Sequence, residues 1–226
     1  MKRSKQTLGK VVSLSIYVLL GSMSQSVFAE VEGNITLASN YIWRGIDQTN
    51  SNPAIQGGFD QNFENGLYVG IWGSNVQGPG ADSNIEMDLY AGFTRSFGDY
   101  GLDFSYIRYE YPKGSPDLEE LMLQGSYKGL GLAYYHNLNS PDTGESENYV
   151  RVKAEINLPS AVGMTLSVGQ NTLKGVDKEV NDALIGFNKH AGGLRFGIAG
   201  TTSNLNHVTG TKTETDFITV SMSKAL

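Results

Sequence analysis

Residues 84–97 read NIEMDLYAGFTRSF, and apolar and polar side chains alternate along them. Ile85, Met87 and Leu89 fall on one face of an extended chain, whereas Glu86 and Asp88 fall on the other. A period of two indicates a β-strand, because successive side chains of a strand point to opposite sides of the sheet. We therefore expect a strand with an apolar medium on one side and a polar space on the other.

The same alternation recurs along the rest of the chain and predicts about twelve strands. We place them at residues 33–44, 54–63, 67–75, 84–97, 102–111, 119–128, 130–138, 148–158, 164–172, 183–191, 194–202 and 216–226. The connections alternate between long and short, as in outer-membrane barrels with short periplasmic turns and long outer loops. A soluble β-sandwich would not need to place its short connections at one end and its long connections at the other. The sequence thus predicts an all-β, antiparallel, up-and-down transmembrane β-barrel.

The first 29 residues have the pattern of a secretory signal peptide. A positive start (Lys2, Arg3, Lys5 and Lys10) precedes an apolar centre over residues 11–20, which is too short for a spanning helix. Small residues before position 30 predict cleavage after Ala29. We expect residues 30–226 to form a single barrel domain in the cell outer membrane.

Charge and composition restrict the function further. Four of the 17 Lys and Arg residues lie in the signal peptide, so the mature chain has 13 cations against 23 Asp and Glu. That acidic balance argues against nucleic acid as a partner and suits a surface among outer-membrane lipids and lipopolysaccharide. The chain has no cysteine, and neither a metal-ligand spacing nor a phosphate-binding loop is recognisable. We therefore expect no cofactor, no metal and no catalytic site.

The polar parity of the strands supplies the candidate lumen-lining residues. Two of them, Arg108 and Glu110, share the parity of the apolar Leu102 and Phe104, so we expect a bulge near residues 106–107 to turn them inward. The full candidate set is Arg44, Gln56, Asp60, Glu86, Asp88, Arg108, Glu110, Arg151, Lys153, Glu155 and Arg195. Charges of both signs in a low-dielectric wall bias the passage of ions. Apart from Arg44 at the mouth and the pair after the expected bulge, four charged candidates are acidic (Asp60, Glu86, Asp88 and Glu155) and three are basic (Arg151, Lys153 and Arg195). This small negative excess, together with the acidic outer loops, predicts a weak preference for cations.

The cluster Trp43-Arg44-Gly45 at the outer end of the first strand has two interpretations. Arg44 could gate the mouth or hold an anionic solute. Alternatively, the glycines here and at Gly57-Gly58 let the wall bend or the first loop fold inward, and we favour this structural interpretation.

Residues 39–60, SNYIWRGIDQTNSNPAIQGGFD, resemble the opening signature of the TorF family, proteobacterial conserved hypothetical proteins that carry a porin label. Tyr68-Val69-Gly70, Trp72-Gly73-Ser74-Asn75, residues 86–92 (EMDLYAG) and Tyr109-Glu110-Tyr111-Pro112 are similar to its next blocks. The similarity is specific over residues 33–112 and looser beyond them. The resemblance implies an outer-membrane barrel and adds little about the substrate.

Three functions follow as hypotheses. The first is a porin-like channel for passive passage of small hydrophilic solutes or ions, because twelve strands enclose a bore between the filled eight-stranded and the open sixteen-stranded barrels. The second is a closed barrel that serves as a surface receptor, adhesion element or structural protein through its long loops. The third and weakest is a lipid-modifying enzyme that uses His136, which no recognisable triad accompanies.

Overall fold

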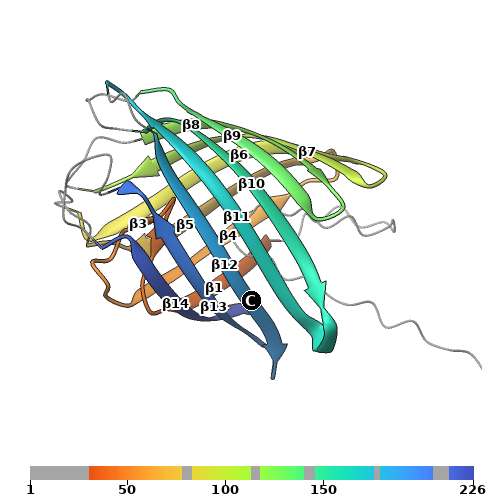
Figure 1. The fold of residues 1–226 in the computed structure, drawn as a ribbon. Coiled ribbons are helices and arrows are strands. Elements are labelled where there is room, and N and C mark those ends of the chain that lie inside the picture. Colours follow the sequence, from red (N-terminus) through yellow and green to blue (C-terminus); the bar gives the residue numbers. More distant parts are fainter. Residues whose placement is uncertain (1–30, 78–82, 113–117, 140–145, 176–178, 206–213) are drawn as a thin grey trace, which may run out of the picture.

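The computed structural model describes residues 31–77, 83–112, 118–139, 146–175, 179–205 and 214–226. Nearly all of these residues are in β-strands, and twelve strands pair edge to edge into one closed antiparallel barrel (Figure 1). The predicted twelve-stranded, up-and-down barrel is confirmed. The predicted signal peptide, residues 1–29, lies outside the described residues. In the described ranges, no helix is long and apolar enough to cross a membrane.

The barrel strands pair in chain order, and the first strand closes the ring against the last. They are β1 (Val31–Ala38), β4 (Ala54–Asn62), β5 (Leu67–Asn75), β6 (Ile85–Phe97), β7 (Tyr100–Glu110), β8 (Leu118–Tyr127), β9 (Leu130–Asn137), β10 (Ser146–Leu158), β11 (Val162–Leu173), β12 (Val180–Ala191), β13 (Leu194–Ser203) and β14 (Asp216–Ala225). Two short strands, β2 (Ile42–Trp43) and β3 (Ile46–Asp47), pair only with each other. A single 3-10 turn, Pro159–Ala161, joins β10 to β11.

The connections are sorted by length between the two ends of the barrel. Residues 63–66, 98–99, 128–129, 159–161 and 192–193 are the short ones and define what we call the turn end. The first of them is closed by Gly66, whose φ of 92° favours glycine and whose N–H donates to the Phe63 carbonyl. The Leu226 N–H donates to the Gly33 carbonyl at the same end. The opposite end, which carries the long connections, is the loop end.

The outer wall of the barrel is apolar. Large apolar side chains on the outward parity are between 37% and 72% exposed to the surroundings. They include Ile35, Ile55, Phe59, Val69, Ile71, Leu89, Phe104, Leu123, Leu132, Val152, Val168, Ile185, Ile198 and Val220. Side chains on the inward parity are mostly polar or aromatic and are far less exposed, so the chain buries its polar groups and exposes its apolar ones. This is the reverse of a water-soluble protein.

The expected bulge near residues 106–107 is absent, and the prediction that Arg108 and Glu110 line the lumen is wrong. The register of β7 is continuous against β6 from Tyr100 to Glu110 and against β8 from Tyr100 to Tyr109. Arg108 and Glu110 therefore stay on the outward parity of Phe104. They lie at the loop end, where an outward side chain need not be apolar. A register shift occurs instead in β10, between Ser146 and Asn148.

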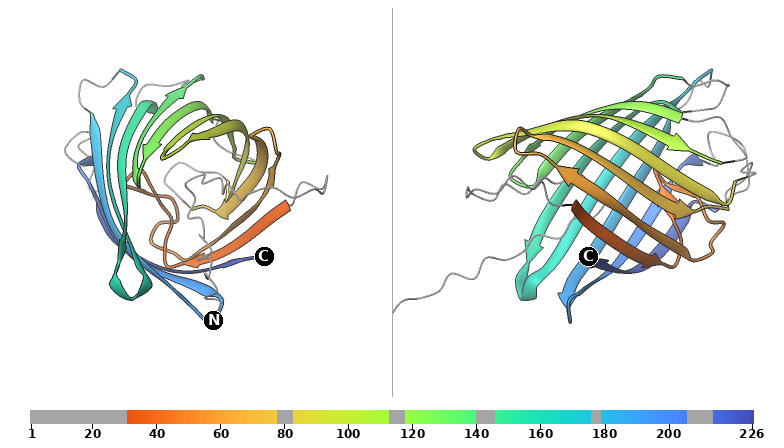
Figure 2. Two further views of the ribbon diagram at one scale, coloured as in Figure 1. Left: turned by 90° about the vertical axis from the view of Figure 1, so that its right-hand side faces the viewer. Right: turned by 180° about the vertical axis from the view of Figure 1, so that it is seen from behind.

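The first predicted strand, residues 33–44, is too long. Strand β1 ends at Ala38, and residues 39–53 leave the barrel wall. Seen nearly along the barrel axis, the orange segment after β1 lies within the ring of strands (Figure 2, left). The favoured interpretation of the Trp43-Arg44-Gly45 cluster, a first loop that folds inward, agrees with this arrangement.

Candidate functional site

The inward loop, residues 39–53, fills part of the lumen near the loop end. It is folded around the β2–β3 hairpin, whose turn residues Arg44 and Gly45 both have positive φ, 50° and 76°. Gly45 lies against the wall, because a Cβ added there would be 2.7 Å from the Cβ of Ser203 and 2.9 Å from that of Asp182. The Ser203 hydroxyl donates to the Gly45 carbonyl at 3.1 Å. The turn is therefore docked on β12 and β13.

Arg44 anchors this loop to the opposite wall. Its Nη1 and Nη2 donate to the two carboxylate oxygens of Glu120 on β8, at 2.8 and 2.7 Å. The two side chains are 5% and 1% exposed, so the pair is shielded from solvent. The guanidinium also lies 4.2 to 4.7 Å from the ring centres of Trp43, Tyr135 and Tyr149. Bidentate geometry and aromatic stacking make arginine specifically suited to this position.

The charge state of Arg44 follows from these contacts. Burial by itself lowers the pKa of the guanidinium, but the adjacent Glu120 carboxylate overcomes this and raises the pKa above its usual value. Arg44 therefore remains charged at neutral pH. Both of its forked donor groups are occupied by Glu120, so this arginine holds the loop rather than a free anion.

Most inward carboxylates accept hydrogen bonds from tyrosine hydroxyls, and of these only Glu120 also forms an ion pair among the described residues. Each of these hydroxyls lies on a different strand or loop from its acceptor, so the pairs link neighbouring parts of the inner wall and, through Tyr41, the inward loop. The pairs are Tyr41 and Tyr111 with Glu86 (3.0 and 3.1 Å), Tyr68 with Asp103 (2.8 Å), Tyr90 with Asp60, Tyr109 with Glu120 (2.9 Å) and Tyr149 with Asp182 (3.0 Å). A phenol satisfies a carboxylate without adding charge, so the lumen keeps its negative groups in place.

The inward cations apart from Arg44 gather on β10 and β13. Lys153 forms an ion pair with Glu155 at 2.9 Å, and Arg151 donates to the Tyr135 hydroxyl at 3.2 Å. Arg195 interacts electrostatically with Glu155, and its Nε is buried without a hydrogen-bond partner among the described residues. The lumen is thus divided between a wall rich in carboxylates, β4 to β8, and a wall rich in cations.

Nine of the eleven predicted lumen residues lie inside the barrel, and two lie outside. On the inside are Arg44, on the inward loop, and Gln56, Asp60, Glu86, Asp88, Arg151, Lys153, Glu155 and Arg195, on the inward parity of their strands. On the outside, Arg108 forms ion pairs with Glu110 and Glu119 at 2.5 and 3.4 Å. Asp88 is 6% exposed, and its Oδ1 has no hydrogen-bond partner within the described ranges.

Several inward groups were missed by sequence reasoning. Glu120, Asp182 and Asp103 are inward carboxylates that are absent from the predicted set. Strand parity could have found two of them: Glu120 alternates with Leu121, and Asp103 lies between Leu102 and Phe104. No local signal marks the tyrosines as carboxylate partners, because the members of each pair lie 11 to 45 residues apart in the sequence.

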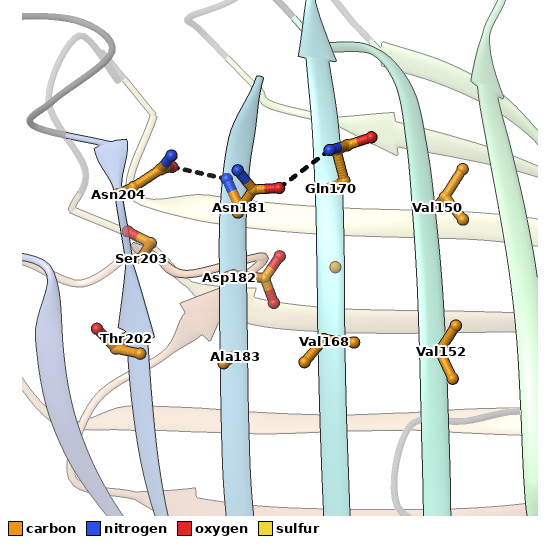
Figure 3. A pocket seen from close by; sticks show the side chains of 11 residues that line it. Val150, Val152, Val168, Gln170, Asn181, Asp182, Ala183, Thr202, Ser203 and Asn204 are labelled. Atoms are coloured by element: carbon orange, nitrogen blue, oxygen red, sulfur yellow. Dashed lines mark hydrogen bonds between the residues drawn. The ribbon is translucent and has the colours of Figure 1, made fainter. Parts of the chain in front are cut away.

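A groove of about 740 Å³ lies outside the lumen, on the wall of β10 to β13 near the loop end (Figure 3). Val150, Val152 and Val168 form its apolar part. Above them, the Asn181 N–H donates to Asn204 at 2.6 Å and Gln170 donates to Asn181 at 3.2 Å. The groove thus marks the change from apolar to polar side chains on the outer wall.

The described residues offer little for catalysis at His136. Its ring faces outward from β9, and Nδ1 lies 2.9 Å from Oδ1 of Asn148. Ser140 and Asp142, its neighbours in sequence, lie outside the described residues. In the part of the chain that the structure describes, no group of three or more His, Cys, Asp or Glu residues is arranged to hold a metal ion.

Residues 23–225 match the model of a family described as "Bacterial protein of unknown function (Gcw_chp)". No curated protein matches the chain in sequence. A solved structure described as "KdgM porin" matches with a TM-score of 0.56 at 6% identity, over 86% of this chain and 97% of that one. A second, described as "Unveiling the Mechanism Behind the in-meso Crystallization of Membrane Proteins", matches with a TM-score of 0.55 at 12% identity, over 86% and 83%. At these identities the likeness establishes the fold.

Proposed function

We propose that this chain, which belongs to the Gcw_chp family of bacterial proteins, is an outer-membrane channel that passes small hydrophilic solutes or ions by diffusion. One observation carries the proposal: a closed twelve-stranded barrel has an apolar outer wall and a charged inner wall. Its likeness in fold to a porin supports the same function. The resemblance of residues 39–60 to the TorF family agrees with it.

The apolar outer wall is the observation that supports a position of the barrel in a lipid bilayer. A spanning segment must satisfy every backbone hydrogen bond internally, and a closed barrel does so because it has no free edge. The exposed apolar side chains would face lipid, whereas the polar groups at the loop end, such as Arg108 and Glu119, would meet headgroups or lipopolysaccharide. The predicted signal peptide would direct the chain to that membrane.

The inward loop limits what the channel can pass. It contacts the wall through Glu86 on β6 and Glu120 on β8, and on another side of the ring through Ser203 on β13. Since the loop occupies the bore near the loop end, the open cross-section there is smaller than a twelve-stranded wall alone would leave. We therefore expect a small-conductance channel and not a wide general pore.

Planar-bilayer recordings test the proposal. Purified, refolded protein should give reproducible small conductance steps, and larger neutral polymers should be excluded from the bore. Deletion of residues 41–51 should enlarge the steps while the strand signal in circular dichroism persists. A correctly folded barrel that stays silent in both forms would contradict a channel function.

The buried Arg44–Glu120 pair favours a second candidate, a closed barrel that acts through its outer loops as a surface receptor or structural protein. If this is correct, wild-type protein is silent in bilayers and only the loop deletion conducts. An enzymatic role is not part of either proposal. An assay for phospholipid or lipopolysaccharide modification, with His136→Ala as the comparison, checks that expectation.

A further inference from the structure

We propose that the lumen contains a binding site for small oxyanions, that is, carboxylate or phosphate groups, on the wall formed by β10 to β13. Arg195 is its central donor, with Arg151 and Lys153 beside it. The proposal rests on the channel function proposed above, because the bore is the route by which a solute would reach this wall.

The three cations share one side of the lumen. Arg151 and Lys153 are two residues apart on β10 and so point the same way, and Arg195 lies on the inward parity of β13. Lys153 interacts electrostatically with both arginines. Glu155, paired with Lys153 at 2.9 Å, is the carboxylate that interacts with Arg195. Asp182, on the inward parity of β12, interacts electrostatically with Arg151. The local balance is therefore three positive charges to two negative.

Arg195 carries a donor that the described protein leaves without an acceptor. Its Nε is buried, and no described residue accepts a hydrogen bond from it. An unsatisfied buried donor on a charged group costs more than a neutral one, so such groups are uncommon unless a ligand or solvent completes them. A guanidinium presents parallel N–H groups whose spacing matches the two oxygens of a carboxylate or phosphate. The position therefore suits an oxyanion.

The carboxylates on the opposite wall are held by other partners. Asp60 and Asp103 each accept a hydrogen bond from a tyrosine hydroxyl on that wall, and Glu86 accepts one from Tyr41 on the inward loop. Arg44 differs from the cations of the proposed site, because Glu120 occupies both of its donor groups. The β10–β13 wall thus keeps an excess of positive charge. A local oxyanion site is compatible with a weak cation preference of the channel as a whole, which depends on the total charge along the bore.

Equilibrium dialysis of inorganic phosphate and of succinate against the refolded full chain in detergent micelles tests the site without requiring conduction. We expect saturable binding by the wild type and a dissociation constant raised about tenfold in Arg195→Gln, through loss of one charged hydrogen-bonding group. Glu155→Gln should bind more tightly, because it removes the nearby negative charge. Lys189→Gln is the matched control, since Lys189 lies on the outward parity of the neighbouring β12 and loses the same charge.

The outcomes separate this proposal from the channel function. Equal affinities of the wild type, Arg195→Gln and Glu155→Gln would overturn the site, as would a loss of affinity in Lys189→Gln as large as that in Arg195→Gln. Saturable phosphate binding by a barrel that is silent in bilayers would support the site and contradict the channel. A conducting barrel that binds neither phosphate nor succinate would contradict the site alone.

Discussion

Breaking the buried ion pair between Arg44 and Glu120 should both destabilise the barrel and widen its bore. In Arg44→Ala, the Glu120 carboxylate, whose side chain is 1% exposed, keeps only the hydrogen bond from Tyr109. Removing one partner of a buried pair costs about 3–5 kcal/mol, because the other charge stays buried without compensation. The lost stacking of the guanidinium on three aromatic rings acts in the same direction.

A double-mutant cycle isolates the pair. Glu120→Gln leaves a neutral side chain that can still accept the Tyr109 hydroxyl, so Arg44→Ala should cost less in that background. We expect a coupling energy of about 1–3 kcal/mol, measured by urea unfolding of the protein in lipid vesicles. Arg108→Ala is the control, because its ion pairs with Glu110 and Glu119 join side chains that are 27% to 39% exposed. Exposed pairs of this kind contribute about 0–1 kcal/mol.

The functional readout is the single-channel conductance. Arg44→Ala removes the bidentate contact between the inward loop and β8, so the loop should leave the bore more often and the conductance should rise. Arg108→Ala should leave the conductance unchanged. If Arg44→Ala unfolds at the same urea concentration as the wild type and conducts identically, the pair neither stabilises the barrel nor holds the loop, and the reasoning is refuted.

Two further predictions test the parity of the wall and the packing of its tyrosines. Val152→Arg places a charge on the apolar outer wall and should cost about 2–4 kcal/mol in lipid vesicles, whereas Thr165→Arg, on the inward side next to Glu155 in register, should cost much less. Equal costs would mean that the two faces are wrongly assigned or that the outer wall does not meet lipid. Gly70→Ala should disturb the Tyr90–Asp60 hydrogen bond, because the new Cβ would be 2.3 Å from the Tyr90 ring that lies over the glycine. An unchanged ultraviolet spectrum of the tyrosines and unchanged stability in that variant would contradict this packing.

The sequence by itself determined the barrel wall. The alternation of Ile85, Met87 and Leu89 with Glu86 and Asp88 predicted which side of β6 faces outward, and the structure agrees. Strand parity is local, since it depends on backbone geometry that repeats every two residues. The sorting of short and long connections likewise predicted an antiparallel up-and-down barrel. Both signals can be read from neighbouring residues without knowing the closed ring.

Sequence reasoning failed where the alternation of apolar and polar residues does not determine the course of the chain or the side of the wall that a residue faces. Alternation continues past Ala38, so residues 39–44 resembled strand, but the inward course of this segment depends on Glu120, which is 76 residues from Arg44. Arg108 and Glu110 broke the expected pattern because a side chain near the end of a strand can face outward and still be polar.

Only the tertiary structure decided how the charges of the lumen are paired. Parity placed Glu86, Asp88, Arg151, Lys153 and Arg195 on the inward side but could not show which of them meet. Pairing of the strands brings tyrosines to most of the carboxylates, and the inward course of residues 39–53 brings Arg44 to Glu120. The other cations are left together on the wall from β10 to β13. Hydrogen bonds and ion pairs depend on distances across the bore, and these are fixed by strand number, register and tilt rather than by any local sequence pattern.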